Sequence, residues 1–158
     1  MKKITILVIA LFAMTITAQA QEIQKLFDKY ANDEKFSYVS VGSGLMEFAS
    51  SFIDGNIDTK TKDLLSKFKG LKVLTLESGA EKKAINSVVD EVTRIIRQDP
   101  KGEAVVETRE KGEIVSIHML SDGLLIMTKG LDELTLVFFS GNLSKESILE
   151  LVSKMKKK

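Results

Sequence analysis

His118 is the only histidine among the 158 residues, and the chain has no cysteine. Histidine is the side chain whose ordinary pKa best suits proton transfer near neutral pH. A catalytic or metal-binding histidine needs an orienting neighbour or further ligands, and no second histidine or cysteine can supply them. Alternation along residues 114–120 places His118 on one strand face with Ile114 and Ser116. We therefore expect His118 to have no catalytic or metal-binding role.

A second motif resembles the start of a calcium-binding loop. Asp54, Asn56 and Asp58 carry oxygen ligands at alternate positions, as such a loop requires. Thr59 stands where the glycine of the sharp turn belongs, and Leu65 stands where the bidentate glutamate belongs. We expect an Asx turn between two helices rather than a metal site.

A third motif, Gly42-Ser43-Gly44, lies between a predicted strand and a predicted helix, as a phosphate-binding loop would. Glu47 replaces the third glycine, and no Gly-Lys-Ser/Thr sequence follows. A tight turn with positive φ is the expectation here. Carboxylate pairs for hydrolysis meet only in the fold and cannot be recognised from spacing. We assign no catalytic, cofactor-binding or metal-binding residue and expect no cofactor.

Two segments have the composition of a contact surface. Lysines at positions 60, 62, 67, 69 and 72 give residues 60–72 a basic bias. A solvated helix face is expected there, and a docking patch for acidic lipid headgroups, polysaccharide or protein is the alternative. The segment from Leu134 to Phe139 is mainly apolar at both alternating positions, so helices are expected on both faces. If one face is uncovered, Val137 and Phe139 form an exposed apolar patch.

Residues 1–20 have the composition of a secretory signal peptide. Lys2 and Lys3 precede an uncharged, mostly apolar run from Ile4 to Ile16, and Ala18-Gln19-Ala20 matches a cleavage site. We expect cleavage after Ala20 and an exported protein of residues 21–158, located in the periplasm or outside the cell. An uncleaved anchor is the alternative, but spanning a bilayer takes about 20 apolar residues. Because the chain has no cysteine, a lipid anchor on cysteine is excluded.

The remaining residues suit one folded domain. Removing Lys2 and Lys3 from the 23 basic residues leaves 21 against 22 acidic residues, a formal net charge of −1. Nucleic-acid binding needs a concentrated positive surface, so no nucleic-acid partner is expected. The chain has a single proline and no Pro-, Gly- or Ser-rich linker, which argues against an internal domain boundary. Without disulfides, stability must come from packing and hydrogen bonds.

Hydrophobic periodicity predicts an α+β domain. Helices are expected over residues 23–32, 45–53, around 64–68, 81–98 and from Ser144 onward, and strands over 36–41, 71–77, 104–109, 114–120, 124–128 and 134–139. Lys111-Gly112 and Asp122-Gly123 are hairpin turn signals. Connections this short require antiparallel pairing. The prediction is a largely antiparallel sheet with a C-terminal β-meander and helices mainly on one face.

Several of these segments together resemble a known family. They are Leu26-Phe27-Asp28-Lys29-Tyr30, Tyr38–Val41, Leu45-Met46, Leu71–Thr75 and Leu136–Gly141. In this layout the chain resembles the Bacteroidota family of small exported proteins catalogued as domain of unknown function family 4252. The resemblance implies an envelope or periplasmic component. Some such proteins are lipid-anchored, and this chain lacks the cysteine that such an anchor requires. The resemblance implies no catalytic residue.

We expect an exported, non-enzymatic module that binds a protein or another envelope macromolecule, without a stable membrane anchor after signal cleavage. Two alternatives stay open: a metal-independent hydrolase of envelope material that uses Asp or Glu, and an accessory of envelope-stress signalling. Exposed apolar residues on the sheet would favour the binding module. A deep pocket with two carboxylates, one of raised pKa, would favour the hydrolase.

Overall fold

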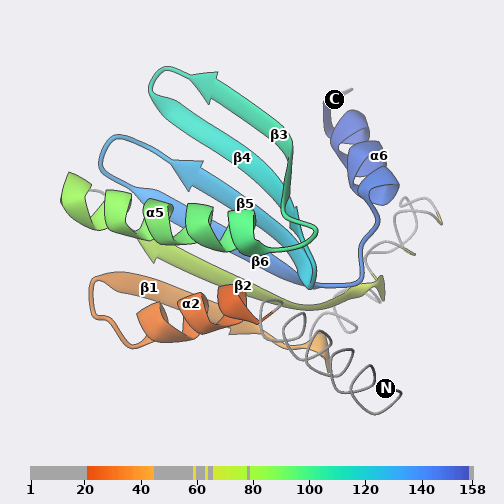
Figure 1. Cartoon of the computed structure of the whole chain (residues 1–158), viewed down its shortest axis with the longest axis horizontal. Coiled ribbons are helices and arrows are strands. Elements are labelled where there is room, and N and C mark those ends of the chain that lie inside the picture. The colour runs from red at the N-terminus through yellow and green to blue at the C-terminus, as the bar shows by residue number, and fades with distance from the viewer. Residues whose placement is uncertain (1–20, 45–58, 60–62, 64–65, 78, 157–158) are drawn as a thin grey trace, which may run out of the picture.

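A computed structural model of the chain describes residues 21–44, 59, 63, 66–77 and 79–156. These residues form one antiparallel sheet of six strands in the order β1-β2-β6-β5-β4-β3, with helices on both faces (Figure 1). This arrangement is the predicted α+β domain. The predicted Asp54, Asn56 and Asp58 motif lies outside the described residues.

The last four strands form the predicted meander. The strands are β1 (Phe36–Val41), β2 (Phe68–Leu76), β3 (Glu103–Glu110), β4 (Glu113–Leu120), β5 (Gly123–Lys129) and β6 (Leu134–Gly141). Strand β2 pairs with β6 along its length and with β1 on its other side. The antiparallel pair of β1 and β2 thus extends the meander into one sheet, with β1 and β3 as its two edge strands.

Two amphipathic helices cover one face of the sheet. Helix α2 (Glu22–Ala31) buries Ile23, Leu26 and Phe27, and α5 (Lys82–Gln98) buries a stripe at three- and four-residue spacing. Helix α5 ends before Pro100, because the residue before a proline disfavours helical geometry. The Tyr30 hydroxyl donates a hydrogen bond of 2.9 Å to Glu91 Oε2, which joins the two helices.

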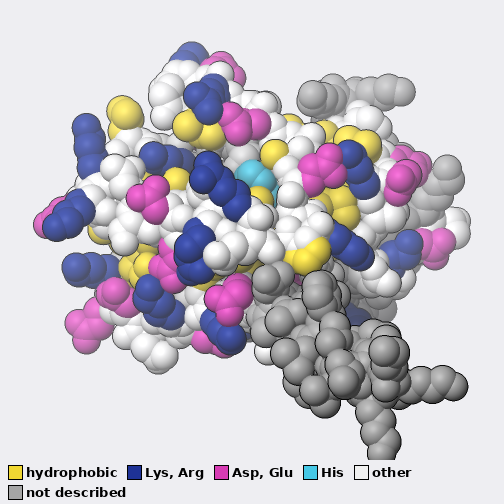
Figure 2. Space-filling view, in the orientation of Figure 1, with side chains coloured by type: hydrophobic (Ala, Val, Ile, Leu, Met, Phe, Trp, Pro, Cys, Tyr) yellow, Lys and Arg dark blue, Asp and Glu magenta, His cyan; other side chains and the backbone are white. Residues whose placement is uncertain are grey.

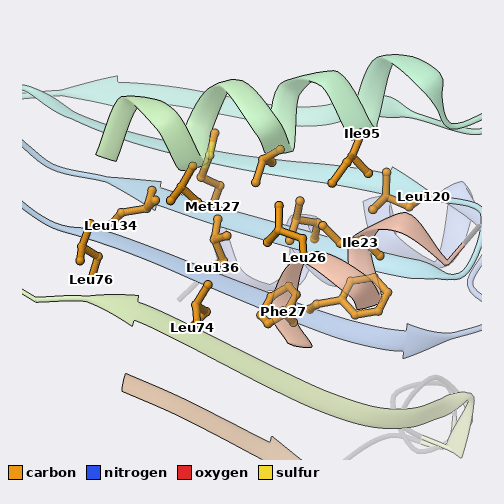
Figure 3. Packing of buried hydrophobic residues seen from close by; sticks show 14 of the residues in the cluster. Ile23, Leu26, Phe27, Leu74, Leu76, Ile95, Leu120, Met127, Leu134 and Leu136 are labelled. Atoms are coloured by element: carbon orange, nitrogen blue, oxygen red, sulfur yellow. The ribbon is translucent and has the colours of Figure 1, made fainter. Parts of the chain in front are cut away.

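The larger core lies between these helices and the sheet. Figure 3 shows Ile23, Leu26 and Phe27 of α2 directed toward the sheet, and the cluster to which they belong includes residues of β2, β4, β5 and β6. Phe27 and Phe138 are fully buried, with ring centroids 6.1 Å apart. Burying side chains of this size contributes about 1.5–3 kcal/mol each, so this cluster supplies most of the driving force for folding.

The third described helix, α6 (Lys145–Lys156), packs on the opposite face. Its Ile148 is buried against Met119 and Leu124, which alternate with residues of the larger core. The predicted N-cap is present, since the backbone N–H of Ser147 donates to Ser144 Oγ at 3.2 Å. No helix of the described residues is long and apolar enough to cross a membrane.

Two local predictions are wrong. Phe68 was expected at the end of a helix, but β2 begins there and continues through Gly70 with a register shift. Gly70 suits this strand because its Cα lies close to a neighbouring strand, where an added Cβ would be 3.1 Å from the carbonyl oxygen of Val41. Gly42 and Gly44 were expected at positive φ, and neither has it.

Candidate functional site

A cavity of about 320 Å³ lies between α5 and strands β3, β4 and β5. We call it the α5–β4 cleft. Figure 2 shows the single imidazole of the chain at the surface, with basic side chains on one side of it and hydrophobic side chains nearby. The cleft is lined by Val89, Thr93, Ile96, Arg97, Ala104, Glu107, Arg109, Ile114, Ser116, His118, Met127 and Lys129.

Ser116 and His118 lie at alternate positions of β4 and face the helices. The sequence predicted this shared face, and both residues line the cleft. The Ser116 side chain is 1% exposed, and its Oγ has no hydrogen-bond partner in the protein. Both ring nitrogens of His118 are also buried without a protein partner. Buried polar atoms in proteins are almost always hydrogen-bonded, so three unpaired atoms from two neighbouring residues are unusual.

Burial lowers the pKa of His118, and the nearby Glu107 carboxylate offsets part of this effect. The imidazole is therefore neutral at pH 7, with one nitrogen that donates a hydrogen bond and one that accepts. No hydrogen bond joins His118 to Ser116, so the serine is not activated as a nucleophile. In this state the two side chains can bind a ligand through hydrogen bonds but are not arranged for acyl transfer.

The rim of the cleft is mostly basic. Arg97 comes from α5, Arg109 from β3 and Lys129 from β5, with Glu107 as the only carboxylate of the lining. Arg109 Nη2 lies 2.8 Å from Glu107 Oε1, and Lys129 donates to Asn86 Oδ1 at 3.2 Å. Arg97 forms no ion pair with any described residue. One carboxylate among three cations leaves the lining with an excess of positive charge.

Sequence reasoning missed the three basic residues because all of them come from elements other than β4. The Lys111-Gly112 turn offered one usable signal. A two-residue hairpin there sets Arg109 opposite Ile114 and Glu107 opposite Ser116, and the structure has this register. The position of α5 over the sheet could not be derived in the same way.

A pair of carboxylates, Asp99 and Asp122, lies at one end of the sheet. Burial raises the pKa of Asp122 to about 6, with a further contribution from the charge of Asp99. Asp99 accepts hydrogen bonds from the backbone amides of Lys101 and Ser121 and from the Ser121 hydroxyl. Neither aspartate lines the α5–β4 cleft or the lysine cavity described below. The described residues also contain no group of three metal-ligating side chains.

The sheet face opposite α2 and α5 carries an aliphatic row that crosses all six strands. Direct cross-strand pairing aligns Val39, Val73, Val137, Ile126, Ile117 and Val106. Helix α6 packs against Ile117 and Ile126, whereas the three valines at the β1 end of the row, Val39, Val73 and Val137, belong to neither core cluster of described residues. The valine on β1 is 54% exposed. We call these three residues the valine patch.

The sequence prediction for this surface is only partly correct. Val137 is partly exposed and belongs to the patch. Phe139 packs instead on the Met119 and Leu124 cluster, and its ring centroid lies 4.9 Å from that of Phe68. The exposed area therefore lies toward β1 rather than at the end of β6.

The two edge strands differ in charge. Strand β1 contains no charged residue and no proline, and its pairing with β2 is continuous. Strand β3 contains Glu103, Glu107, Arg109 and Glu110, and its pairing with β4 is interrupted by a register shift. Charges and bulges are the features that prevent an edge strand from pairing with another chain. The edge at β3 has them, and the edge at β1 does not.

The predicted basic patch is divided by the fold. Lys67 and Lys69 line a broad cavity of about 680 Å³ together with Lys101 and Lys145. Lys72 lies apart from them and forms an ion pair of 3.0 Å with Asp28 of α2. The lysines at positions 60 and 62 lie outside the described residues. We call this space the lysine cavity.

The comparisons with known proteins give one match. The family described as Domain of unknown function (DUF4252) matches residues 30–151, which include every described strand and most of α6. Neither the curated proteins nor the solved structures gave a match.

Proposed function

The chain belongs to the DUF4252 family, and because that description assigns no activity, we propose from the structure that it is an exported, non-enzymatic module that binds another protein at β1. The observation that carries the proposal is the contrast between the two edges of the sheet. Strand β1 presents an uncharged edge beside the valine patch, whereas β3 is charged and bulged.

The partner is a protein with an extended, uncharged segment. An unpaired edge strand offers a row of backbone N–H and C=O groups, and a partner strand that pairs with them gains main-chain hydrogen bonds. Val39 lies on the sheet face opposite α2 and α5. An apolar side chain at the matching position of the partner strand would therefore extend the aliphatic row beyond β1. Ser37 lies on the same face and is exposed, which suits a short polar neighbour.

Export is part of this proposal. The composition of residues 1–20 supports a cleaved signal peptide, and α2 begins at Glu22, directly after the predicted cleavage site. Helix α2 buries Ile23 and Leu26 in the larger core, so a domain that starts at Gln21 keeps the residues that the core needs. The site of action is then the periplasm or the exterior, in agreement with an envelope protein as partner.

The hydrolase alternative receives less support. It requires a deep pocket with two carboxylates, and Glu107 is the only acid that lines the α5–β4 cleft. Asp122 has the raised pKa that a general acid needs, but it lines neither this cleft nor the lysine cavity. Its partner Asp99 is engaged by three hydrogen-bond donors.

The test compares two substitutions at opposite ends of the same aliphatic row. Val39→Lys places a charge on the β1 edge, and Val106→Lys places the same charge on β3 as a matched control. Tagged wild-type and variant proteins are cross-linked in the native cells, purified and analysed by mass spectrometry. Thermal unfolding of each variant establishes that it is folded.

We expect one stoichiometric envelope partner with the wild type and with Val106→Lys, and its loss with Val39→Lys. Hydrogen exchange of the purified complex should show new protection of the amides of residues 36–41. Recovery of the same partner with Val39→Lys, or protection confined to other strands, would contradict the proposal. A dimer of this chain joined at β1 would also contradict it, because the proposed partner is a different protein.

A further inference from the structure

We propose that the α5–β4 cleft binds a small organic anion, with its carboxylate or phosphate group at Arg97 and Arg109 and its body against Ser116 and His118. This inference is independent of protein binding at β1, because no residue of β1 lines the cleft. An experiment that contradicts one of the two proposals therefore does not contradict the other.

The first argument is the set of unpaired polar atoms at the base of the cleft. Ser116 Oγ and both His118 ring nitrogens are buried and have no partner in the protein. Leaving a buried donor or acceptor unpaired is costly, whereas apolar residues of similar shape at these positions would avoid the cost. A hydroxyl and a neutral imidazole together supply both donors and acceptors, which suits a ligand body with polar substituents.

The second argument is the charge of the rim. Arg97 has no ion pair among the described residues, and Arg109 uses only its Nε and Nη2 donors on Glu107. A guanidinium has five N–H donors in a planar fork, so Arg109 keeps three for another acceptor. Carboxylate and phosphate groups match this geometry with two parallel hydrogen bonds. The lining contains only one acid to compete for these donors.

The third argument is the size and composition of the space. A volume of about 320 Å³ is at the lower end of known small-molecule sites, so the ligand is compact. Ile96 of α5, Ile114 of β4 and Met127 of β5 provide apolar walls between the basic rim and the polar base. Apolar walls with a few convergent polar groups are typical of ligand sites. The expected ligand has an oxyanion at one end and an apolar body with a polar substituent.

The lysine cavity is the weaker candidate for an anion site. Its lysines are exposed, and Lys145 already forms an ion pair with Glu103. Ser144, also in its lining, is used to cap α6. It has no buried polar atom without a partner, which is the feature that marks the α5–β4 cleft.

The experiment follows ligand binding through the NMR signals of the His118 imidazole. His118 is the only histidine, so its ring protons give a single set of resonances in the NMR spectrum of the whole chain. Benzoate and phenyl phosphate are titrated separately, with benzamide as the neutral probe of the same shape. We expect saturable movement of the His118 signals with an anionic probe, at a dissociation constant on the order of 1 mM for a molecule this small. The tighter of the two anions identifies carboxylate or phosphate as the preferred group.

Two arginines of α5 provide the matched variants. Arg97→Gln removes a rim charge and should weaken binding of the anionic probe about tenfold, the effect of one charge-assisted hydrogen bond. Arg94→Gln removes the same charge from the same helix, at an exposed residue that pairs with Gln98 and does not line the cleft. Its affinity should stay within about twofold of the wild type.

A bound anion also changes the titration of His118. The charged groups that face it are Arg97 from α5, Glu107 and Arg109 from β3, and Lys129 from β5. A ligand oxyanion adds negative charge to this set, so the His118 pKa should rise on binding and the probe should bind more tightly as the pH falls. Absence of saturable movement with both anions, equal binding of benzamide, or unchanged affinity in Arg97→Gln would each overturn the proposal.

Discussion

The Asp99 carboxylate accepts hydrogen bonds from both the side chain and the backbone of Ser121. It accepts a hydrogen bond from the Ser121 hydroxyl at 2.7 Å and from the Ser121 backbone amide at 3.0 Å. The end of α5 is thereby joined to the turn between β4 and β5. Because Asp99 is 7% exposed, little solvent is available to replace these bonds.

We expect Asp99→Ala to lower the free energy of unfolding by about 2 kcal/mol, because it leaves the amides of Ser121 and Lys101 without an acceptor. Urea unfolding monitored by circular dichroism measures the change. Asp90→Ala, at an exposed position of α5, is the matched control and should change stability by less than about 0.5 kcal/mol. Equal stability of the two variants would show that the Asp99 contacts contribute little.

Gly123 is required by close packing rather than by backbone conformation. An added Cβ would lie 2.0 Å from the carbonyl oxygen of Phe139, and the φ of this glycine is not positive. We expect Gly123→Ala to cost more than about 3 kcal/mol, since the β5–β6 pairing must move apart. Gly42→Ala, where a Cβ meets nothing within 4 Å, is the control and should be near neutral. Chemical denaturation of both variants provides the comparison.

Gly123 also illustrates what the sequence could predict. The Asp122-Gly123 signal correctly predicted a tight turn, but the two loop residues are Ser121 and Asp122, and Gly123 pairs with Leu120. Local periodicity predicted the elements of the meander and the stripe of α5 because each depends on neighbours in sequence. The helix expected before Gly70 is present at Asp63 and Ser66 but does not reach Phe68, because pairing of β2 with a strand more than 60 residues away determines where β2 begins.

Only the residues at the base of the α5–β4 cleft could be predicted from the sequence. Alternation placed His118 and Ser116 on one face, and hairpin register could have added Glu107. Arg97 joins them because α5 crosses the meander above β4, an arrangement set by burial of Val88 and Val92 against distant strands. The contrast between β1 and β3 was likewise hidden, since a sequence does not show which strands lie at the edges.

Replacing Ser116 by alanine should stabilise the protein in the absence of a ligand. The substitution removes a buried hydroxyl with no partner in the protein and leaves a void of one atom, so we expect a gain of about 1 kcal/mol in unfolding free energy. Differential scanning calorimetry without added anion measures it. In the titration with benzoate the same variant should bind about threefold more weakly. A loss of stability would show that the hydroxyl is satisfied in the native protein.

Asp122 should make the protein less stable at neutral than at mildly acidic pH. Its pKa of about 6 in the folded protein lies above the unfolded value of 3.8, so the folded state binds more protons between these values. Stability from this group therefore increases as the pH falls from 6 to 3.8 and is lost as the pH rises through 6. Asp122→Asn should remove this dependence and raise stability at pH 7.5 by about 1 kcal/mol, after allowance for solvent screening.

The contribution of His118 to the pH dependence of stability must be separated from that of Asp122. The two groups titrate in overlapping pH ranges, and their effects on stability have opposite signs. Its pKa is lowered in the folded protein, so the unfolded state binds the extra proton and stability falls as the pH drops below 6.5. Urea unfolding from pH 4 to 8 is therefore measured for Asp122→Asn in both the wild-type and the His118→Gln backgrounds. In the His118→Gln background, only Asp122 of these two groups still titrates. There the gain from Asp122→Asn should be largest above pH 6 and vanish near pH 4, and a gain that did not change with pH would show that Asp122 is not the titrating group.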